Sequence, residues 1–367
     1  MSSNSVKEVD GMTKNLYLMG TAGSGKSVVA LGLARIFQER GIKTAYFKPK
    51  SSGGDPNKRV DDDIVLMKEV LGMDFPSEVI SPFRTGPLYL STYHRQEPDS
   101  IKKKILDAYG QVAKDAEVVL IEGSSTPFAS AGLDIDDFRL AADLSAPVLV
   151  VTKVINDYSL DAAVFMNKLL KFKGLEVTGH IFNNVRRILL DKTRGIYQPL
   201  LEKKGELLGI IPEDPQVTAP TVLEYQTALG GEVLAAEDRM DRIVEDVVVG
   251  SMNIESALTY LRRSLNKAFI TGGDRSDLAL TALETSTSVL ILTGGLYPDV
   301  RVLAKADERK VPVILVHSDT YTTIERVHHL SRHIKPMEKK VIELAHRQVL
   351  DNCNVDLILK KLGISGS

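Results

Sequence analysis

The sequence predicts an α/β protein with a mostly parallel sheet, and two observations carry this prediction. Short β-rich apolar runs alternate with longer amphipathic stretches, which is the pattern of a parallel sheet with covering helices. The length of 367 residues, with 26% charged and 43% hydrophobic residues, is typical of a globular protein of about two domains. The strands expected in the first part are residues 16–19, 44–47, 118–122, 148–151, 177–182 and 207–211.

The segments around the first strand have recognisable limits. Residues 1–14 are polar and are expected to be flexible. An amphipathic helix is expected over residues 27–40, and Gly41 is suited to end it in a left-handed conformation. A long loop-rich stretch, residues 49–98, then interrupts the alternation. Loops of this length inside a compact domain are usually functional or disordered.

A change of composition near residues 229–231 indicates a domain boundary, so we expect one domain over 15–229 and a second over 230–367. A charged helix is expected over 232–249. The second domain then repeats the α/β alternation, and its four-residue string Ile-Thr-Gly-Gly at 270–273 is echoed by Leu-Thr-Gly-Gly at 292–295. This echo predicts two successive strand–turn–helix corners. The strands expected here are residues 268–271, 289–293 and 313–317.

Composition also narrows the class of partner and the compartment. The net charge is −2, which argues against a nucleic-acid binder because such proteins carry a basic domain or stripe. No apolar run approaches the roughly 20 residues of a membrane helix, so no membrane partner is expected. The single cysteine, Cys353, cannot form an internal disulfide, which favours a reducing, cytoplasmic compartment.

The strongest local pattern is the P-loop motif Gly-Thr-Ala-Gly-Ser-Gly-Lys-Ser at residues 20–27, between a predicted strand and a predicted helix. Glycines let successive backbone N–H groups face a phosphate, and the new helix adds its positive end. Lys26 is expected to reach the terminal phosphates, and Ser27 to ligate Mg²⁺. The alternative is a glycine-rich turn without a ligand. The residues expected to cradle the nucleotide are Gly20, Gly23, Ser24, Gly25, Lys26 and Ser27.

Three further charged features follow the P-loop, and two of them lie at strand ends that point into the same crevice. Glu122 ends a fully apolar strand, and Lys48 directly follows the second strand. Three adjacent aspartates, residues 61–63, precede a helical run. Each has a simpler interpretation: a strand-end surface residue, a solvated lysine, and acidic groups that complement a helix dipole.

These features, in this order, resemble the dethiobiotin synthetase group of P-loop ligases, and more closely the N-terminal synthetase-like domain of some phosphotransacetylases. The resemblance covers residues from about 15 to 225, including Lys48-Pro49 with Ser51-Ser52-Gly53, and it ends with 179–183 and 208–212. It implies that Mg²⁺ is held by Ser27, Asp63 and Glu122, with Asp62 as the fallback for Asp63. It implies that Lys48 contacts substrate and phosphoryl group, and it assigns Asn183 and Pro212 to the nucleotide.

The chain departs from this family on the substrate side of the site. Four residues separate the loop glycines where dethiobiotin synthetases have five, which argues against dethiobiotin synthesis. Glu122-Gly123 is followed by residues 124–128 in place of further glycines. Thr21 occupies the position of the signature lysine of the MinD-like branch, which disfavours that branch. The chain has no Asn-Lys-x-Asp string, so ATP is favoured over GTP.

The second domain resembles the small domain named after its DRTGG signature, over residues of about 250–345. The residues that carry this resemblance are 270–277, 292–295 and 317–320. Such domains form dimeric, regulatory modules, and some bind adenine nucleotides. Asp274 is expected to cap the helix that starts near Arg275. A possible second ligand site is Gly272, Gly273, Asp274 and Arg275, with a dimerisation surface as the alternative.

Two functions follow as expectations. The first is an ATP- and Mg²⁺-dependent ligase in which Lys26 and Lys48 are catalytic and a carboxylate or carbamate of an unidentified small molecule is activated. The second is a non-catalytic nucleotide sensor. A homodimer is expected in either case from the DRTGG resemblance. Phosphate acetyl transfer is not expected, because the chain ends at residue 367, before the acetyl-transferring domain of phosphotransacetylases.

Overall fold

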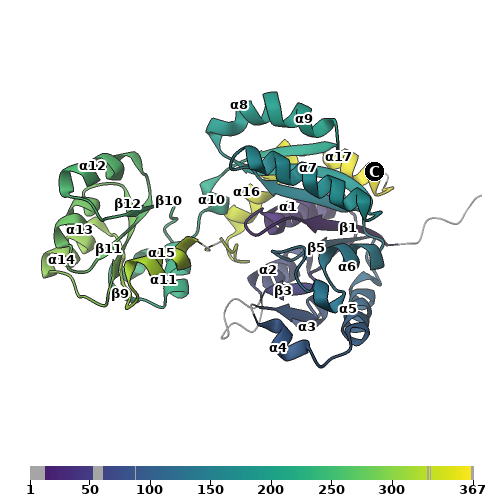
Figure 1. Ribbon diagram of the computed structural model, residues 1–367, viewed down its shortest axis with the longest axis horizontal. Helices are drawn as coiled ribbons and strands as arrows, with labels where there is room; N and C mark the ends of the chain where they lie inside the picture. The colour runs from purple at the N-terminus through teal and green to yellow at the C-terminus, as the bar shows by residue number, and fades with distance from the viewer. Residues whose placement is uncertain (1–12, 53–60, 87, 329, 331, 365–367) are drawn as a thin grey trace, which may run out of the picture. The chain divides into compact units, whose positions relative to one another are not determined.

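The computed structural model describes residues 13–52, 61–86, 88–328, 330 and 332–364, and the chain forms two compact units. The first unit comprises Met1–Glu213 and Ile334–Ser367, and the second comprises Asp214–His333. Figure 1 labels the elements of both. Most of the segment predicted to be flexible and Gly53 lie outside the described residues. Among the residues that the structure describes, no helix is both long and apolar enough to cross a membrane.

The first unit is built on a parallel sheet with strand order β2-β5-β1-β6-β7-β8. All six predicted strands are present in it. The first begins earlier than expected, because Lys14 already pairs with Val118. A separate parallel pair is formed by β3 (Lys50–Ser52) and β4 (Phe83–Thr85). The strands of the large sheet are β1 (Lys14–Met19), β2 (Thr44–Phe47), β5 (Val118–Glu122), β6 (Val148–Lys153), β7 (Val177–Val185) and β8 (Leu207–Pro212).

Helices cover both faces of this sheet. One face packs on α5, α6 and α7 through buried side chains such as Ile105, Leu140 and Leu170. The helices of the unit are α1 (Lys26–Glu39), α2 (Asp62–Leu71), α3 (Ser77–Ile80), α4 (Tyr89–Tyr93), α5 (Pro98–Ala113), α6 (Asp137–Asp143), α7 (Asp157–Phe172), α8 (Leu190–Lys192), α9 (Gln198–Glu202), α16 (Lys339–Asn352) and α17 (Val355–Lys361).

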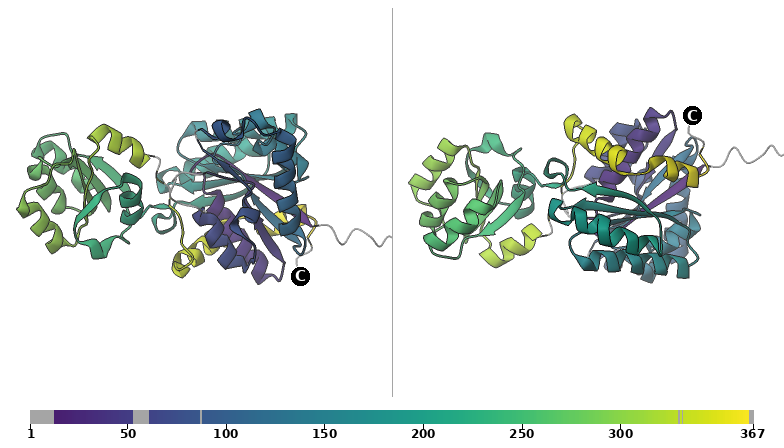
Figure 2. Two further views of the ribbon diagram at one scale, coloured as in Figure 1. Left: turned by 90° about the horizontal axis from the view of Figure 1, so that it is seen from below. Right: turned by 90° about the horizontal axis from the view of Figure 1, so that it is seen from above.

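The C-terminal helices differ from the predicted domain organisation, which assigned everything after residue 229 to the second domain. Figure 2 shows the yellow C-terminal helix α16 beside the purple helix α1. The two pack closely, because a Cβ on Gly32 of α1 would lie 2.4 Å from Cγ2 of Val349. Cys353, just after α16, also bridges to Gly209 of β8. Residues 334–364 therefore complete the first unit.

The second unit is a smaller α/β sandwich with strand order β10-β11-β12-β13-β9, in which only β9 runs antiparallel. Helices α12, α13 and α14 contribute to the core on one face, and α11 and α15 to the core on the other. Its elements are α10 (Pro215–Thr218), α11 (Val222–Leu229), β9 (Glu232–Ala235), β10 (Asp246–Val249), α12 (Ile254–Arg263), β11 (Lys267–Gly272), α13 (Ser276–Leu283), β12 (Thr287–Thr293), α14 (Val300–Arg309), β13 (Val313–Leu315) and α15 (Thr320–His328).

One predicted element of this unit is wrong. The charged helix expected over 232–249 is replaced by the two edge strands β9 and β10. The valines of 247–249 are β-branched and half-buried, and they pair in register with β11, so tertiary pairing outweighs the charge pattern. The two glycine-pair corners are confirmed, because β11 leads into α13 and β12 leads into α14.

Candidate functional site

The P-loop connects the carboxyl end of β1 to the start of α1. Gly23 and Gly25 have φ angles of 67° and 83°, in the left-handed region that favours glycine. Space is also restricted: a Cβ at Gly25 would lie 2.1 Å from Nδ2 of Asn183, and a Cβ at Gly20 would lie 2.3 Å from the Val151 carbonyl oxygen. The glycines of the motif are therefore required by backbone conformation and by close packing.

Lys26 lies against the loop from which it emerges. Its Nζ donates to the carbonyl oxygens of Gly20 at 2.9 Å and Thr21 at 3.1 Å, and the residue is only 7% exposed. Burial lowers the pKa of Lys26, and the nearby charge of Glu122 opposes that shift. A desolvated cation beside a helix N-terminus is suited to an anionic ligand.

Four residues predicted from sequence converge next to the loop. The Ser27 Oγ atom lies 3.0 Å from Oδ2 of Asp63 and 2.9 Å from Oε1 of Glu122. The Lys48 Nζ atom lies 2.8 Å from Oδ2 of Asp63 and 3.3 Å from Oε1 of Glu122. These side chains come from α1, α2 and the ends of β2 and β5, so the fold assembles them from distant parts of the sequence.

The charges of this cluster are strongly coupled. Burial by itself lowers the pKa of Lys48, but the charges of Glu122 and Asp63 outweigh it and raise the pKa well above that of a free lysine. Burial raises the pKa of Glu122, and the charge of Lys48 opposes that effect. Lys48 is therefore a stable cation, whereas burial outweighs its charge at Glu122 and leaves the pKa of that carboxyl group raised.

The cluster fits a magnesium ion. The Ser27 hydroxyl has one hydrogen, so it can donate to only one of the two carboxylates that lie within 3.0 Å of its oxygen. The other oxygen–oxygen contact needs a proton or a cation to be favourable, and in this structure the Lys48 Nζ atom lies beside both carboxylate oxygens. Two carboxylates and a hydroxyl are the oxygen ligands that Mg²⁺ prefers. Ser27, Asp63 and Glu122 are thus the residues that would hold the ion.

Two further side chains contact the cluster, and neither was assigned to the site from sequence. Tyr46 is buried, and its hydroxyl donates to Oε2 of Glu122 at 2.9 Å. It lies two residues before Lys48, and on an extended strand this spacing places both on one face, which was the available signal. Asp61 accepts a hydrogen bond from the Asp63 amide as the N-cap of α2, and it also pairs with Lys48 at 2.9 Å.

A buried ion pair lies beside the cluster and was also missed. The Lys50 Nζ atom is 2.8 Å from Oδ1 of Asp137, and both side chains are 0% exposed. Oδ2 of Asp137 accepts from the Ser124 amide at 2.8 Å. Since Lys50 is two residues after Lys48 and Ser124 is two after Glu122, the pair ties together the two segments that carry those residues. No local pattern signals it, because its members lie far apart in the sequence.

The residues assigned to the nucleotide base lie at the carboxyl ends of β7 and β8. Asn183 is buried, and its Nδ2 donates to the Ser24 carbonyl oxygen at 2.8 Å. The side-chain amide of Asn183 therefore supports the P-loop in this structure. Pro212 ends β8 and pairs with Val185. Asn184, which follows Asn183, has a φ of 51° and was not predicted from sequence.

The glycine turn of the second unit is organised differently from the expectation. Arg275, and not Asp274, occupies the N-cap position of α13, and no side chain caps this helix end. The cap prediction for Asp274 is therefore wrong, because the helix begins one residue later than expected. Arg275 makes a two-point ion pair with Asp277, with both contacts at 3.0 Å, and it donates to the Met252 carbonyl oxygen at 3.3 Å.

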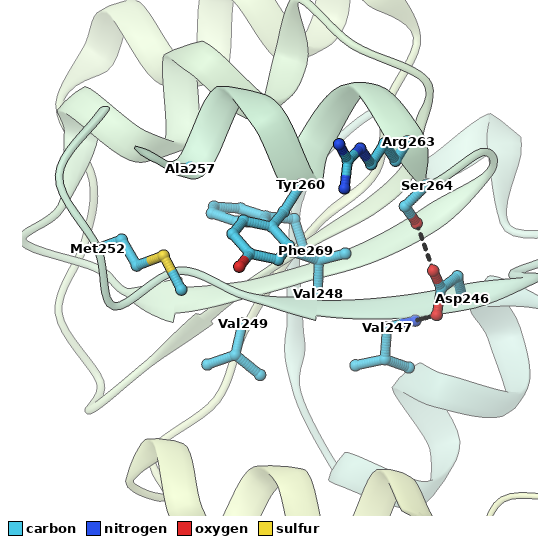
Figure 3. A pocket seen from close by; sticks show the side chains of 10 residues that line it. All are labelled: Asp246, Val247, Val248, Val249, Met252, Ala257, Tyr260, Arg263, Ser264 and Phe269. Atoms are coloured by element: carbon cyan, nitrogen blue, oxygen red, sulfur yellow. Dashed lines mark hydrogen bonds between the residues drawn. The ribbon is translucent and has the colours of Figure 1, made fainter. Parts of the chain in front are cut away.

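A cavity of about 380 Å³ opens beside this turn, between β10 and α12 (Figure 3). The rings of Tyr260 and Phe269 lie at its centre, and a hydrogen bond of 2.7 Å joins Ser264 to Asp246 at one end. Met252, whose carbonyl Arg275 contacts, lines it. Gly272, Gly273, Asp274 and Arg275 do not line the cavity.

Comparison with known proteins agrees with this arrangement. Residues 14–221 match the family described as AAA domain, and residues 224–330 match the DRTGG domain. A phosphate acetyltransferase of Nitratidesulfovibrio vulgaris is 28% identical over 364 residues, covering 91% of this chain and 49% of that protein. A cobyric acid synthase of Moorella thermoacetica is 28% identical over 237 residues, covering 57% of this chain and 45% of that protein.

Among solved structures, the septum site-determining protein MinD complexed with Mg-ADP from Pyrococcus horikoshii is 17% identical, with a TM-score of 0.35, over 56% of this chain and 84% of that one. Some curated relatives match most of this chain, and the chain spans about half the length of those relatives. Its P-loop domain is followed by a DRTGG domain, and the chain is related to phosphotransacetylases. Because the match at residues 14–221 covers more than half of its length, the chain belongs to the AAA domain family.

Proposed function

We propose that the P-loop unit binds ATP with Mg²⁺ and transfers the γ-phosphoryl group to an oxygen of a small carboxylate or carbamate. The observation that carries this proposal is that Ser27 and Lys48 each lie within 3.3 Å of both Asp63 and Glu122 beside the P-loop. Such a set of two carboxylates, a hydroxyl and a buried lysine supports phosphoryl transfer, which depends on positioning and charge stabilisation.

The residues of the chain have separate tasks in this reaction. The attacking carboxylate oxygen forms a bond to the γ-phosphorus while the bond from phosphorus to the bridging oxygen breaks and ADP leaves. Lys26 and Lys48 stabilise the charge on the transferred group. Bound Mg²⁺, held by Ser27, Asp63 and Glu122, would neutralise phosphate charge. The resulting acyl phosphate is then captured by an amine, with release of phosphate.

The nucleotide base is proposed to lie near Asn183 and Pro212. Both are at the carboxyl ends of strands in the parallel sheet, where ligands of open α/β sheets bind, and this position supports the proposal. Preference for ATP remains a prediction from sequence. The acceptor is proposed to face the segment 124–130, which differs most from the dethiobiotin synthetase pattern.

The test of nucleotide binding uses a charged variant and a matched control. ATP with Mg²⁺ is expected to raise the Tm of the wild type and of Lys43→Ala, an exposed lysine elsewhere in the unit, but not that of Lys26→Ala. Equal stabilisation of the Lys26→Ala variant would show that the P-loop does not hold the nucleotide.

The test of chemistry needs no knowledge of the amine. ATP labelled with ¹⁸O in the bridging position between the β- and γ-phosphorus is incubated with single members of a carboxylate collection, and label movement to a non-bridging β-oxygen is measured. Movement that depends on one carboxylate identifies the acyl phosphate step. Nucleotide binding without label movement for any member favours the alternative function described next.

The second candidate is a nucleotide sensor without an acceptor reaction, and the cavity lined by Tyr260 and Phe269 favours it because a regulatory ligand needs such a site. The turn Gly272–Arg275 is proposed to act on that cavity through the contact of Arg275 with the Met252 carbonyl. Mass spectrometry of small molecules that co-purify with the chain separates the two functions. A homodimer and a cytoplasmic location are further parts of the proposal.

A further inference from the structure

Helix α7 carries a row of aromatic side chains on its solvent side. Tyr158 is 78% exposed, Phe165 is 66% exposed and Phe172 is 89% exposed. Figure 1 shows α7 as an outer helix of the first unit. Large apolar side chains that are exposed singly need no explanation, but a contiguous exposed patch of this kind marks an interaction surface.

The spacing of the row is that of one helix face. The three aromatic residues are seven positions apart, so they lie on one side of the helix, and Ala162 lies between the first two. Leu169, at the corresponding position between Phe165 and Phe172, is half-buried against the core. Ala162 is exposed and small, so a second helix can approach closely beside it. The opposite side of α7 is already used, since Leu160, Ala163 and Leu170 are buried against the sheet.

The row is also symmetric about Phe165. In an antiparallel pair of α7 helices with Phe165 at the two-fold axis, residues equally distant from it face each other, so Tyr158 of one copy meets Phe172 of the other. The exposed charges have the matching polarity, because Asp161 precedes Phe165 and Lys168 follows it. Each aspartate then lies near the lysine of the partner helix, whereas a parallel pairing would place like charges side by side.

The area of the row is sufficient for a specific contact between two copies. A buried aromatic side chain contributes roughly 150–250 Å², so the three at their observed exposure offer about 450 Å² per helix. Two copies together would bury about 900 Å² through these residues alone, close to the roughly 1,000 Å² of a specific interface, and neighbouring side chains add to it. A self-complementary patch of this type is what a two-fold dimer requires.

We propose that the solvent face of α7, formed by Tyr158, Ala162, Phe165 and Phe172, is a homodimer interface in which two copies of α7 pack antiparallel across a two-fold axis at Phe165. The proposal deepens the homodimer suggested above and does not depend on ATP chemistry. The occupant of the surface is a second copy of this chain, as the symmetric spacing and the opposite charges require.

The oligomeric state of the full chain, measured by sedimentation equilibrium, tests the surface. The wild type is expected to be dimeric. Phe165→Asp places two like charges at the axis and is expected to raise the dimer dissociation constant by roughly 30-fold or more, the size of a central hot spot. Tyr321→Asp, at an exposed aromatic residue of the second unit, is the control and should leave the constant unchanged.

Charge reversal tests the antiparallel register. Asp161→Lys alone is expected to weaken the dimer, and the double variant Asp161→Lys with Lys168→Asp is expected to restore it. A monomeric wild type would overturn both the homodimer and this interface, and binding to vesicles would then identify a lipid surface as the occupant. A dimer that survives Phe165→Asp would overturn the α7 interface alone. Retained Tm shifts with ATP in each variant would show that the proposed function is unaffected.

Discussion

The two units organise their charged side chains in opposite ways. In the P-loop unit, Lys48 is buried among Asp61, Asp63 and Glu122, and all of these groups are within 3.3 Å of its Nζ atom. In the second unit, Arg275 of the glycine turn forms its ion pair with Asp277 at the surface. Both regions are glycine-containing strand–turn–helix corners, so the local chain path is similar while the surroundings differ.

The difference between the two regions follows from how deeply their charged side chains are buried. Removing charges from water is costly, so a buried set of like charges persists only where a counter-charge or a ligand compensates it. The pairing of Arg275 at the surface needs no such compensation, because solvent screens both groups. The cavity of the second unit accordingly lies beside its glycine turn and is mainly aromatic and aliphatic in lining, with charge at its margin.

Loss of Lys48 should have the largest effect on stability. Lys48→Met leaves three carboxylates without their buried cation, and we expect a loss at the upper end of about 3–5 kcal/mol in the free energy of unfolding. Because Mg²⁺ can replace the lost charge, it should stabilise this variant more than the wild type. Urea unfolding with and without Mg²⁺ measures both, and an equal Mg²⁺ response in the two proteins would argue against a metal site at these carboxylates.

Loss of the Lys50–Asp137 ion pair should have the second largest effect on stability. Lys50→Met leaves a buried aspartate unpaired, and we expect a loss of about 3–4 kcal/mol, whereas Lys50→Met combined with Asp137→Leu should recover most of it. The measurement is urea unfolding of both variants beside the wild type. A double variant as unstable as the single one would show that Asp137 contributes mainly through its bonds to Ser124.

The pH dependence of the first unit should show a smaller effect. Burial lowers the pKa of His180 to about 4. As the pH falls from about 6.5 to 4, the unfolded chain binds a proton that the folded chain does not, so stability is lost over this window, up to about 3 kcal/mol. Urea unfolding at several pH values should show this component in the wild type and not in His180→Gln. Hydrogen exchange of the wild type at the two ends of this pH window should show that the loss of stability occurs in the first unit.

The smallest effect is expected at the surface pair of the second unit. Arg275→Met should barely change the urea midpoint, because the partners of Arg275 are partly exposed. Asp277→Asn serves as the matched variant from the other side of the pair. A large loss of stability in either variant would remove the contrast between the two corners and would indicate that the turn is a structural centre of its unit.

The fold of the first unit was predictable in most of its parts because its sheet is parallel. Each buried strand reads as a short apolar run, such as 118–121, and the helix after the P-loop is amphipathic. The segment 232–249 was not predictable, because its charged composition suits a surface helix. Its two ends become strands only because they pair with β13 and β11. The placement of α16 on α1 likewise depends on contacts between residues more than 300 positions apart.

The candidate site also contains some residues that were predictable from sequence and others that were not. Ser27, Lys48 and Glu122 were predictable because each follows or ends a recognisable strand or motif. Tyr46 has a local spacing signal that was overlooked, and Asp61 is one of three adjacent aspartates, of which Asp63 was assigned to the site. Lys50 and Asp137 had none, since a lysine and an aspartate far apart in sequence are ordinary surface residues until the fold buries them together.

The sequence by itself therefore determined the P-loop, the order of strands and helices in the first unit, and the residues at the carboxyl ends of the parallel strands. These features depend on local periodicity and on motifs whose backbone conformation requires particular residues. Only the tertiary structure decided which charges meet, which lysine is neutralised by an unpredicted aspartate, and which aromatic residues of α7 remain exposed. Those properties depend on burial and on distances between remote segments, and no local pattern encodes either.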